Sequence, residues 1–463
     1  MIAQASARMG RLASSWRHAA LNRHVLSAAA TVAAATFVLK LVTAGRELVV
    51  AHRFGTGDAL DAFLIAMLAP SFVISVQVAA FSAALMPSVI RVADQQGPAA
   101  ARRLIQNALL GVCLLLLALT GLLYAAGEPI VRLLGSGFSA EKRSLTLELL
   151  HLLLPIIMLQ GLVRFFATLL NARRRFGLVA LVPLATPLLT VLLLVLAWRA
   201  DPRLLVAGMV GGAGLELALL MPLIRRLGLP VLPRWHGFDE ATRTVVRQYL
   251  PTMLGALTGS AVAMVDQTMA AALEPGSVAS LSYAGKISTL ILAFSAQPLS
   301  VAILPYLSRL AAARKSHQLR QAFLSWVVLV VALSTPLAAA LGLYSEDLVR
   351  LLFERGEFTR QDTILVGYLQ MIYAMKMPFY LAGVLGSRFL NALSMNGVTG
   401  LIGVMNFVAN IVGNLILMRF LGVAGIALST VLVYALSSVV IVTVVHRRLA
   451  RMCREPAEGG GAS

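Results

Sequence analysis

The sequence predicts an all-α protein that crosses a membrane many times. Of its 463 residues, 59% are hydrophobic and only 13% are charged, and the mean hydropathy is +0.84. Long apolar runs alternate with short loops, which is the pattern of a polytopic membrane protein. In a soluble chain the net charge of +19 would favour nucleic-acid binding. Here the basic residues fall mostly in loops on one side, so membrane topology explains them and we expect no nucleic-acid partner.

Twelve apolar segments are long enough to cross a bilayer. They cover residues 26–51, 60–90, 104–127, 144–171, 177–198, 204–224, 248–273, 278–308, 322–343, 361–391, 395–418 and 421–445. If the N-terminus lies in the cytoplasm, 23 Lys and Arg fall in inside segments and 10 in outside loops. Because cytoplasmic loops carry an excess of positive charge, this bias predicts that both termini lie inside.

An internal repeat at an offset of 218 residues divides the chain into two halves. The segment 81–93 (FSAALMPSVIRVA) is echoed by 298–311 (PLSVAILPYLSRLA), and 132–138 (RLLGSGF) by 350–358 (RLLFERGEF). Six predicted helices separate the copies, which predicts two six-helix lobes related by an axis along the membrane normal. The predicted parts are a cytoplasmic basic arm (1–25), a first lobe (26–227), a linker (228–240), a second lobe (241–447) and a cytoplasmic tail (448–463).

Charged residues interrupt the first apolar run. Lys40, Arg46 and Glu47 lie close together on it, and a glycine-containing turn then leads Asp61 into the second span. A charged side chain near mid-bilayer costs roughly 2.5–3.5 kcal/mol on insertion scales, so it usually faces a polar cavity or a partner. We therefore expect these side chains to face a hydrophilic cavity, with Glu47 and Asp61 at its gate.

This stretch resembles the signature of the MurJ/MviN lipid II flippases, within the multidrug/oligosaccharidyl-lipid/polysaccharide exporter superfamily. The matching residues are Arg46, Phe54, Gly55, Gly57, Asp61, Ala62 and Phe63, while Lys40 stands where an arginine is expected. Second-lobe segments such as LFERGEFT (352–359) extend the resemblance over residues 30–447. The resemblance implies a V-shaped central cavity in which Arg46 meets the pyrophosphate of a polyprenyl-linked sugar.

Three basic residues form the predicted pyrophosphate site: Arg46, Lys286 and Lys40, which match by position cations that the family places in its cavity. Charge-assisted contacts from Arg or Lys suit a group that carries about two negative charges. The alternatives are an intramembrane ion pair of Arg46 with Asp61 or Glu47, and a Lys40 side chain that extends to the membrane interface. The other cations within predicted spans have no assigned role; they are Arg164, Lys376 and Arg388.

A candidate cation site involves three of the later helices. Asn410 and Asn414 are four residues apart and share a helix face, Asp266 supplies a carboxylate and Thr430 a hydroxyl. Some members of the family bind sodium between comparable helices, but here an asparagine stands where a second carboxylate is expected. Interhelical hydrogen bonding by asparagine explains the same residues, and we prefer that interpretation at this point. No metal site is assigned.

These observations predict a flippase that moves an undecaprenyl-pyrophosphate-linked glycan across the bacterial inner membrane by alternating access. The glycan is a lipid II-like peptidoglycan precursor or an exopolysaccharide or O-antigen unit. We expect no enzyme activity and no cofactor, since the chain lacks a G-x-x-x-x-G-K-[ST] motif and the common hydrolase motifs. A Na⁺ gradient, an H⁺ gradient and the membrane potential all remain open as driving forces.

Two features leave the substrate open. Lipid II flippases usually carry two further C-terminal helices, where this chain has HRRLARMCREPAEGGGAS, and a charged second helix, where it reads SFVISVQVAAFS. The rival function is a drug/cation antiporter of the same superfamily, which a net basic cavity disfavours. Besides the lipid-linked glycan and the surrounding membrane lipid we expect no partner, and the chain is expected to be a monomer.

Overall fold

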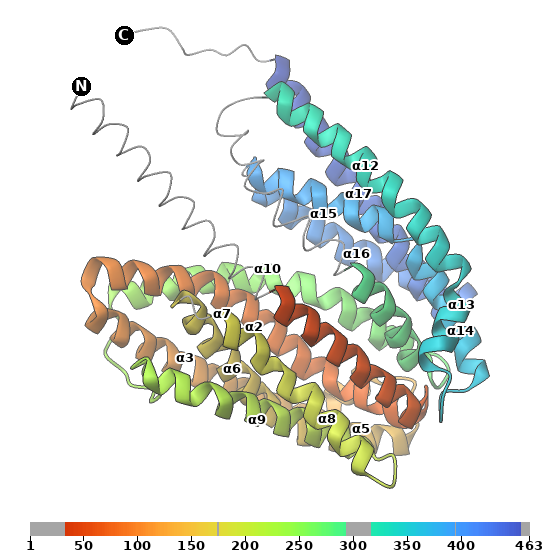
Figure 1. Cartoon of the computed structure of the whole chain (residues 1–463), viewed down its shortest axis with the longest axis horizontal. Coiled ribbons are helices and arrows are strands. Elements are labelled where there is room, and N and C mark those ends of the chain that lie inside the picture. The colour runs from red at the N-terminus through yellow and green to blue at the C-terminus, as the bar shows by residue number, and fades with distance from the viewer. Residues whose placement is uncertain (1–32, 174–175, 293–315, 394, 455–463) are drawn as a thin grey trace, which may run out of the picture.

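The computed structural model describes residues 33–173, 176–292, 316–393 and 395–454, and every regular element among them is a helix (Figure 1). The first half contains a helix over residues 33–54 (helix 33–54), α2 (Asp58–Gln96), α3 (Pro98–Ala125), α4 (Gly127–Leu134), α5 (Ala140–Leu153), α6 (Pro155–Ala172), α7 (Phe176–Leu181), a 3₁₀ turn η1 (Val182–Leu184), α8 (Ala185–Leu196) and α9 (Pro202–Arg226). The second half contains α10 (Glu240–Ala270), a helix over residues 277–292 (helix 277–292), α12 (Ser316–Leu343), α13 (Ser345–Phe353), α14 (Arg360–Ala374), α15 (Met377–Ala392), α16 (Asn396–Leu421) and α17 (Val423–Arg454).

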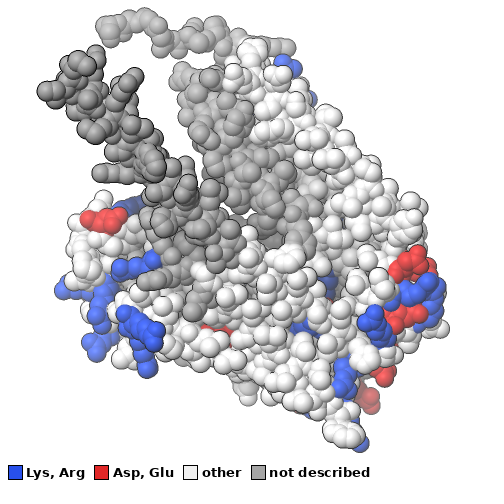
Figure 2. Space-filling view, viewed as in Figure 1, with Lys and Arg blue, Asp and Glu red and all other residues white. Residues whose placement is uncertain are grey.

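The described helices are those of a polytopic membrane protein, as predicted. Eight spans among them are long and apolar enough to cross a membrane, or nine if the bent pair α14 and α15 counts as one span. Leu117 and Leu122 of α3 are more than 60% exposed, which suits contact with lipid tails. On the face shown in Figure 2, most charged side chains gather towards two ends, and few are visible in the band between them. The total of twelve spans stays a prediction, because 26–51 and 278–308 lie partly outside the described residues.

Two predicted spans are broken helices instead of continuous ones. The span 144–171 divides at Leu154 into α5 and α6, and the span 361–391 divides into α14 and α15, which are bent by 41°. Pro155 and Pro378 stand in the first turn of the helix that follows each break. Because proline has no N–H to donate, it interrupts a continuous helix but is tolerated at the start of a new one.

The repeated stretches 132–138 and 350–358 fold alike. Each closes a short helix, α4 or α13, and leads through a glycine-containing turn into a capped helix, α5 or α14. Ser139 caps α5 by accepting from the Lys142 N–H, and Thr359 caps α14 in a reciprocal capping box with Asp362. The second copy of the other repeated stretch, 298–311, lies outside the described residues.

The two lobes meet at one end and diverge from it, so that the helices form a V (Figure 1). The main hydrophobic core runs through the first lobe and crosses into the second at the joined end, where it includes Val278, Tyr283 and Phe353. A separate core, with Phe323 and Phe389, holds together the part of the second lobe formed by α12, α15 and α17. In the predicted orientation, the joined end faces outward and the V opens to the cytoplasm.

One helix of the second half lies against the first lobe. α10 packs along α2 over much of its length and also contacts α16. Figure 1 shows α10 beside α2, with the rest of the second lobe above it. α10 therefore lines the space between the lobes, and residues near its end reach the cavity described below.

Candidate functional site

A cavity of 610 Å³ lies between helix 33–54 of the first lobe and several helices of the second. Helix 277–292 forms most of its other wall, and α10, α13 and Tyr373 of α14 complete it. Its polar lining residues are Lys40, Thr43, Glu47, Asp266, Gln267, Ser282, Lys286, Thr289 and Tyr373. Lys40, Thr43 and Glu47 follow the spacing of one face of a helix, which explains how a mostly apolar segment presents a polar stripe.

Glu47 joins the two lobes beside this cavity. Its carboxylate accepts from Lys286 Nζ at 2.5 Å and, through its other oxygen, from the guanidinium of Arg46. The Lys286 ammonium also lies 5.1 Å from the ring centroid of Tyr283. Glu47 is only 8% exposed, so the two cations are held by a carboxylate that is largely screened from solvent. Arg46 thus pairs with Glu47 and not with Asp61. Lys40 lines the same cavity and forms no ion pair with the residues that the structure describes.

Asp61 does not line the cavity, contrary to our expectation. It lies at the joined end of the lobes and is 1% exposed. Its Oδ2 accepts from Lys142 Nζ and from the Gly276 N–H, both at 2.8 Å, and its Oδ1 accepts from the Ala279 N–H at 2.8 Å. Asp61 therefore caps helix 277–292 from the opposite lobe, where a negative charge is favourable. The sequence could not show this, because Asp61 lies near Arg46 in the chain but beyond the turn that follows helix 33–54.

A second set of contacts closes the joined end. The Glu357 N–H donates to the His52 carbonyl at 3.0 Å, and the Thr56 hydroxyl donates to Asp362. Gly55 has a φ of +53° and lies directly against the Glu357 carbonyl, so a side chain there would be both strained and obstructed. We call these contacts, together with those of Asp61, the outer seal.

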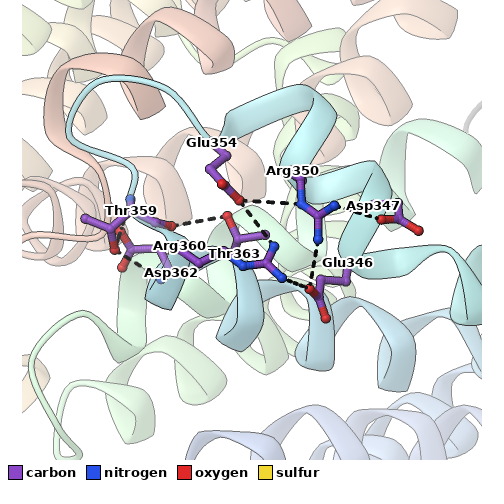
Figure 3. A network of polar contacts seen from close by, with 8 residues as sticks. All are labelled: Glu346, Asp347, Arg350, Glu354, Thr359, Arg360, Asp362 and Thr363. Atoms are coloured by element: carbon purple, nitrogen blue, oxygen red, sulfur yellow. Dashed lines mark hydrogen bonds and ion pairs between the residues drawn. The ribbon is translucent and has the colours of Figure 1, made fainter.

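The second-lobe side of the outer seal is rigidified by a polar network between α13 and α14 (Figure 3). Arg350 contacts Glu346 at 3.2 Å and Asp347 at 3.3 Å, and Arg360 bridges Glu346 and Glu354. Figure 3 shows Asp362 turned towards Thr359, whose backbone N–H donates to it at 2.7 Å. The segment LFERGEFT was predicted as part of the family resemblance, but its contact with the first lobe was not predicted.

The candidate cation site assembles from the predicted residues. Asp266 Oδ1 accepts from Asn414 Nδ2 at 2.7 Å and from Asn410 Nδ2 at 2.9 Å, and its Oδ2 accepts from the Thr430 hydroxyl at 3.1 Å. The two Asn Oδ1 atoms are buried and have no hydrogen-bond partner within the described part of the chain. One carboxylate, two amide oxygens and a hydroxyl are ligands of the type that hard cations prefer. Both the hydrogen-bonding interpretation and an oxygen-rich cation site are thus compatible with this cluster.

A protein-family model, described as lipid II flippase MurJ, matches residues 50–456. The chain belongs to the MurJ family. It is similar to a probable lipid II flippase MurJ of Rhizobium meliloti (strain 1021), with 28% identity over 366 residues, which cover 76% of this chain and 67% of the relative.

Solved structures agree with the fold of this MurJ-family chain. A lipid II flippase MurJ in an inward closed conformation superimposes with a TM-score of 0.77 at 21% identity, covering 91% of this chain and 89% of that one. An inward-facing multidrug resistance MATE family transporter of the MOP superfamily gives a TM-score of 0.75 at 15% identity, with 90% and 96% covered. The MurJ fold and the MATE fold therefore share this two-lobe architecture.

The three cations without an assigned role lie in different surroundings. Arg164 is exposed on α6, and Arg388 is half-buried on α15. Lys376 is 7% exposed, and its ammonium lies 4.2 Å from the ring centroid of Tyr373. Of the three, Lys376 is thus the one next to a cavity-lining side chain of the MurJ-family fold.

A buried acid in the first lobe was not assigned from the sequence. Glu216 of α9 is 2% exposed and accepts from Gln160 Nε2 at 3.0 Å and from the Thr186 hydroxyl at 2.5 Å. Gly212 lies one turn before Glu216 and allows α8 to approach closely at Thr186. The acid is therefore a hydrogen-bonded link between α6, α8 and α9, remote from the cavity of this MurJ-family chain.

Proposed function

We propose that this protein is a flippase of the bacterial cytoplasmic membrane for an undecaprenyl-pyrophosphate-linked glycan, either lipid II or a related unit for another polysaccharide. The observation that carries the proposal is the cavity between the lobes, where cations of both lobes converge on Glu47. The glycan crosses as a monomeric transporter changes shape, with no covalent step.

Glu47 marks the place where the pyrophosphate binds. Its carboxylate and a phosphate oxygen are both acceptors for the same donors, Arg46 and Lys286. A pyrophosphate carries about two negative charges, one more than Glu47, and can accept from Arg in a bidentate manner. It therefore competes with Glu47 for both cations, and binding redistributes the contacts that hold helix 33–54 to helix 277–292.

Those same helices carry the outer seal, which couples binding to opening. Helix 277–292 begins at the Asp61 cap, and helix 33–54 ends at the turn that contacts Glu357. A rearrangement at Lys286 is thus transmitted along one rigid helix to its capped end. A ligand shifts a conformational equilibrium only if it binds the two conformations with different affinities. The substrate must therefore bind more tightly to the conformation in which Glu47 has released the cations.

The cavity also favours an anionic substrate over a drug cation. Among the described residues, each acid at the cavity faces a lysine: Glu47 contacts Lys286, and Asp266 lies in the field of Lys376. With Arg46 and Lys40 added, cations outnumber acids around the cavity. An organic cation would therefore meet no free carboxylate, which disfavours the antiporter function.

Depletion of the protein in its host tests the proposal. We expect an undecaprenyl-pyrophosphate glycan to accumulate in the membrane, and mass spectrometry of the lipid extract identifies it as lipid II or as another unit. Wild type restores the normal level, whereas Arg46→Ala leaves at least about tenfold more intermediate, since losing a charge-assisted contact of about 1.5–3 kcal/mol corresponds to tenfold or more.

The matched control is Arg164→Ala, which removes an arginine that is exposed on α6 and, unlike Arg46, forms no ion pair with Glu47 in the described part of the chain. It is expected to restore the normal level. If no lipid-linked glycan accumulates on depletion, or if Arg46→Ala rescues as well as wild type at equal expression, the proposal is wrong.

A further inference from the structure

Lys376 is a buried lysine that the proposed pyrophosphate site does not use. It lies at the junction of α14 and α15, where the two helices bend by 41°, and it is 7% exposed. Its ammonium lies over the face of Tyr373, 4.2 Å from the ring centroid. An ammonium at this depth requires a compensating charge, because its desolvation is costly.

The compensating charge is Asp266. The charges of Lys376 and Asp266 act on each other through space, and no direct ion pair joins the two residues in the described part of the chain. Tyr373, on which Lys376 rests, lines the same cavity as Asp266. Asp266 on α10 and Lys376 at the α14–α15 bend are thus related through Tyr373, which lies beside the lysine and lines the cavity with the acid.

The presence of Lys376 changes what the Asp266 cluster can bind. Asp266, Asn410, Asn414 and Thr430 offer oxygen ligands, but a single carboxylate opposed by an ammonium gives the cluster no net negative charge. A Na⁺ ion placed there would add an uncompensated positive charge in a poorly solvated site. The oxygen ligands fit Na⁺, whereas the local charge does not.

We propose that Lys376 is a tethered counter-ion that takes the place of a free cation at Asp266, so that this chain binds no Na⁺ in its second lobe. For transport the inference rests on the proposed function, and it predicts a flippase that works equally well in Na⁺ and in K⁺. Lys376 is in this sense a specificity-determining residue, because removing its charge leaves the oxygen ligands and Asp266 available to Na⁺.

A Na⁺ titration of the purified full-length protein in detergent tests this inference without any glycolipid. Na⁺ is raised from about 1 to about 100 mM against choline at constant ionic strength, and the midpoint of thermal unfolding is recorded. The wild-type midpoint is expected to stay constant. The midpoint of Lys376→Met is expected to rise by about 2–4 °C and to saturate, as for a ligand that binds the folded state.

Three controls define the site. The double variant Lys376→Met, Asp266→Asn is expected to lose the Na⁺ response, and Lys40→Met, which removes another lysine of the cavity, is expected not to gain one. K⁺ is expected to give Lys376→Met a smaller shift than Na⁺. A saturable Na⁺ shift in the wild type, or no shift in a folded Lys376→Met, overturns the inference.

If Lys376→Met folds poorly, a double-mutant cycle of the thermal unfolding midpoint tests the inference instead. Each single substitution, Asp266→Asn or Lys376→Met, leaves one buried charge unpaired and is expected to lower the midpoint, whereas the double variant is expected to lose clearly less than the sum. Strictly additive losses would show that the two charges do not compensate each other. Since neither assay contains glycolipid, both outcomes are independent of whether the proposed substrate is correct.

Discussion

Glu47 shows how one carboxylate can prepare a site for a different anion. Holding the partly buried Arg46 and Lys286 close together would be unfavourable without an acceptor, and Glu47 supplies it from the position after Arg46. The two cations therefore keep their place while the cavity is empty of substrate. A phosphate that arrives finds its donors already oriented, which lowers the entropic cost of binding.

Asp61 gives the clearest prediction at the scale of single residues. Asp61→Asn keeps the size of the side chain but removes the charge that pairs with Lys142 and caps helix 277–292. The outer seal should weaken by about 1–3 kcal/mol, which corresponds to a shift of about 5- to 150-fold towards the open seal. A cysteine at the cavity-lining Ser282 should then react several-fold faster with a membrane-impermeant maleimide added outside.

Asp58→Asn is the matched control for that experiment. Asp58 also contacts Lys142, at 2.6 Å, but its side chain is 63% exposed, and exposed ion pairs contribute little. Both variants are made with Cys113 and Cys453 replaced by serine. Equal labelling rates in Asp61→Asn and Asp58→Asn would contradict the role of Asp61 in the seal.

The sequence predicts that charged residues of the spans line a cavity more reliably than it predicts where each of them lies. Lys40, Lys286 and Glu47 were expected at the cavity and line it, because a charge within an apolar span has few other stable surroundings. Asp61 was misplaced, since its distance from the cavity depends on where the preceding helix ends. The link between Lys376 and Asp266 could not be predicted, because Asp266 lies on α10 and Lys376 at the junction of α14 and α15, and no sequence pattern relates the two positions.

At the scale of elements, the turn after helix 33–54 matters because it forms the contact between the lobes. Gly55→Ala introduces a Cβ at a φ of +53° and against the Glu357 carbonyl. Backbone strain alone costs about 1 kcal/mol or more, and the collision adds to it only while the seal is closed. We expect a lower thermal midpoint and loss of complementation in the depleted host.

Gly97→Ala separates strain from collision. Gly97, between α2 and α3, has a φ of +87°, but a Cβ there meets no atom within 4 Å among the described residues. Because Gly97 also has a ψ of 173°, a conformation that is nearly restricted to glycine, this variant should lower the thermal midpoint at least as much through backbone strain and still complement. If Gly97→Ala loses complementation just as Gly55→Ala does, backbone strain and not the seal explains the result.

The elements themselves could be predicted only in part. Long apolar runs identified the spans, but the breaks at Pro155 and Pro378 were not predicted, because proline also occurs in continuous membrane helices. The short helices α4 and α13 were taken for loops, since each has fewer residues than a span and mixes charged with apolar side chains.

For the whole molecule, alternating access predicts that locking the outer seal stops transport. Thr56 and Asp362 are hydrogen-bonded across the lobes, so cysteines at both positions should form a disulfide in the sealed state. Under oxidising conditions the double variant should fail to relieve the accumulated glycolipid, and a reductant should restore it. Cells that carry either single cysteine should be unaffected by the oxidant, and transport by the fully cross-linked protein would exclude opening at this seal.

The architecture as a whole was the part best predicted by sequence. Composition and the lengths of the apolar runs are sufficient to indicate a helical membrane protein, and the MurJ resemblance supplied the V-shaped arrangement that the structure shows. The position of α10 against α2 could not be read from the repeat, because a repeat relates the two halves to each other and does not state which helices lie at their interface.

In the proposed function, the excess of cations around the cavity predicts which half of the transport cycle responds to voltage. Lys40, Arg46, Lys286 and Lys376 exceed Glu47 and Asp266 by about two charges, and a pyrophosphate brings about two of the opposite sign. The loaded transporter is thus nearly neutral, whereas the empty one is a cation. An inside-negative potential acts on it with about 2.3 kcal/mol per charge per 100 mV and draws it back towards the cytoplasm. For the proposed flippase we therefore expect the membrane voltage to act mainly on the return of the empty carrier and only weakly on the loaded one.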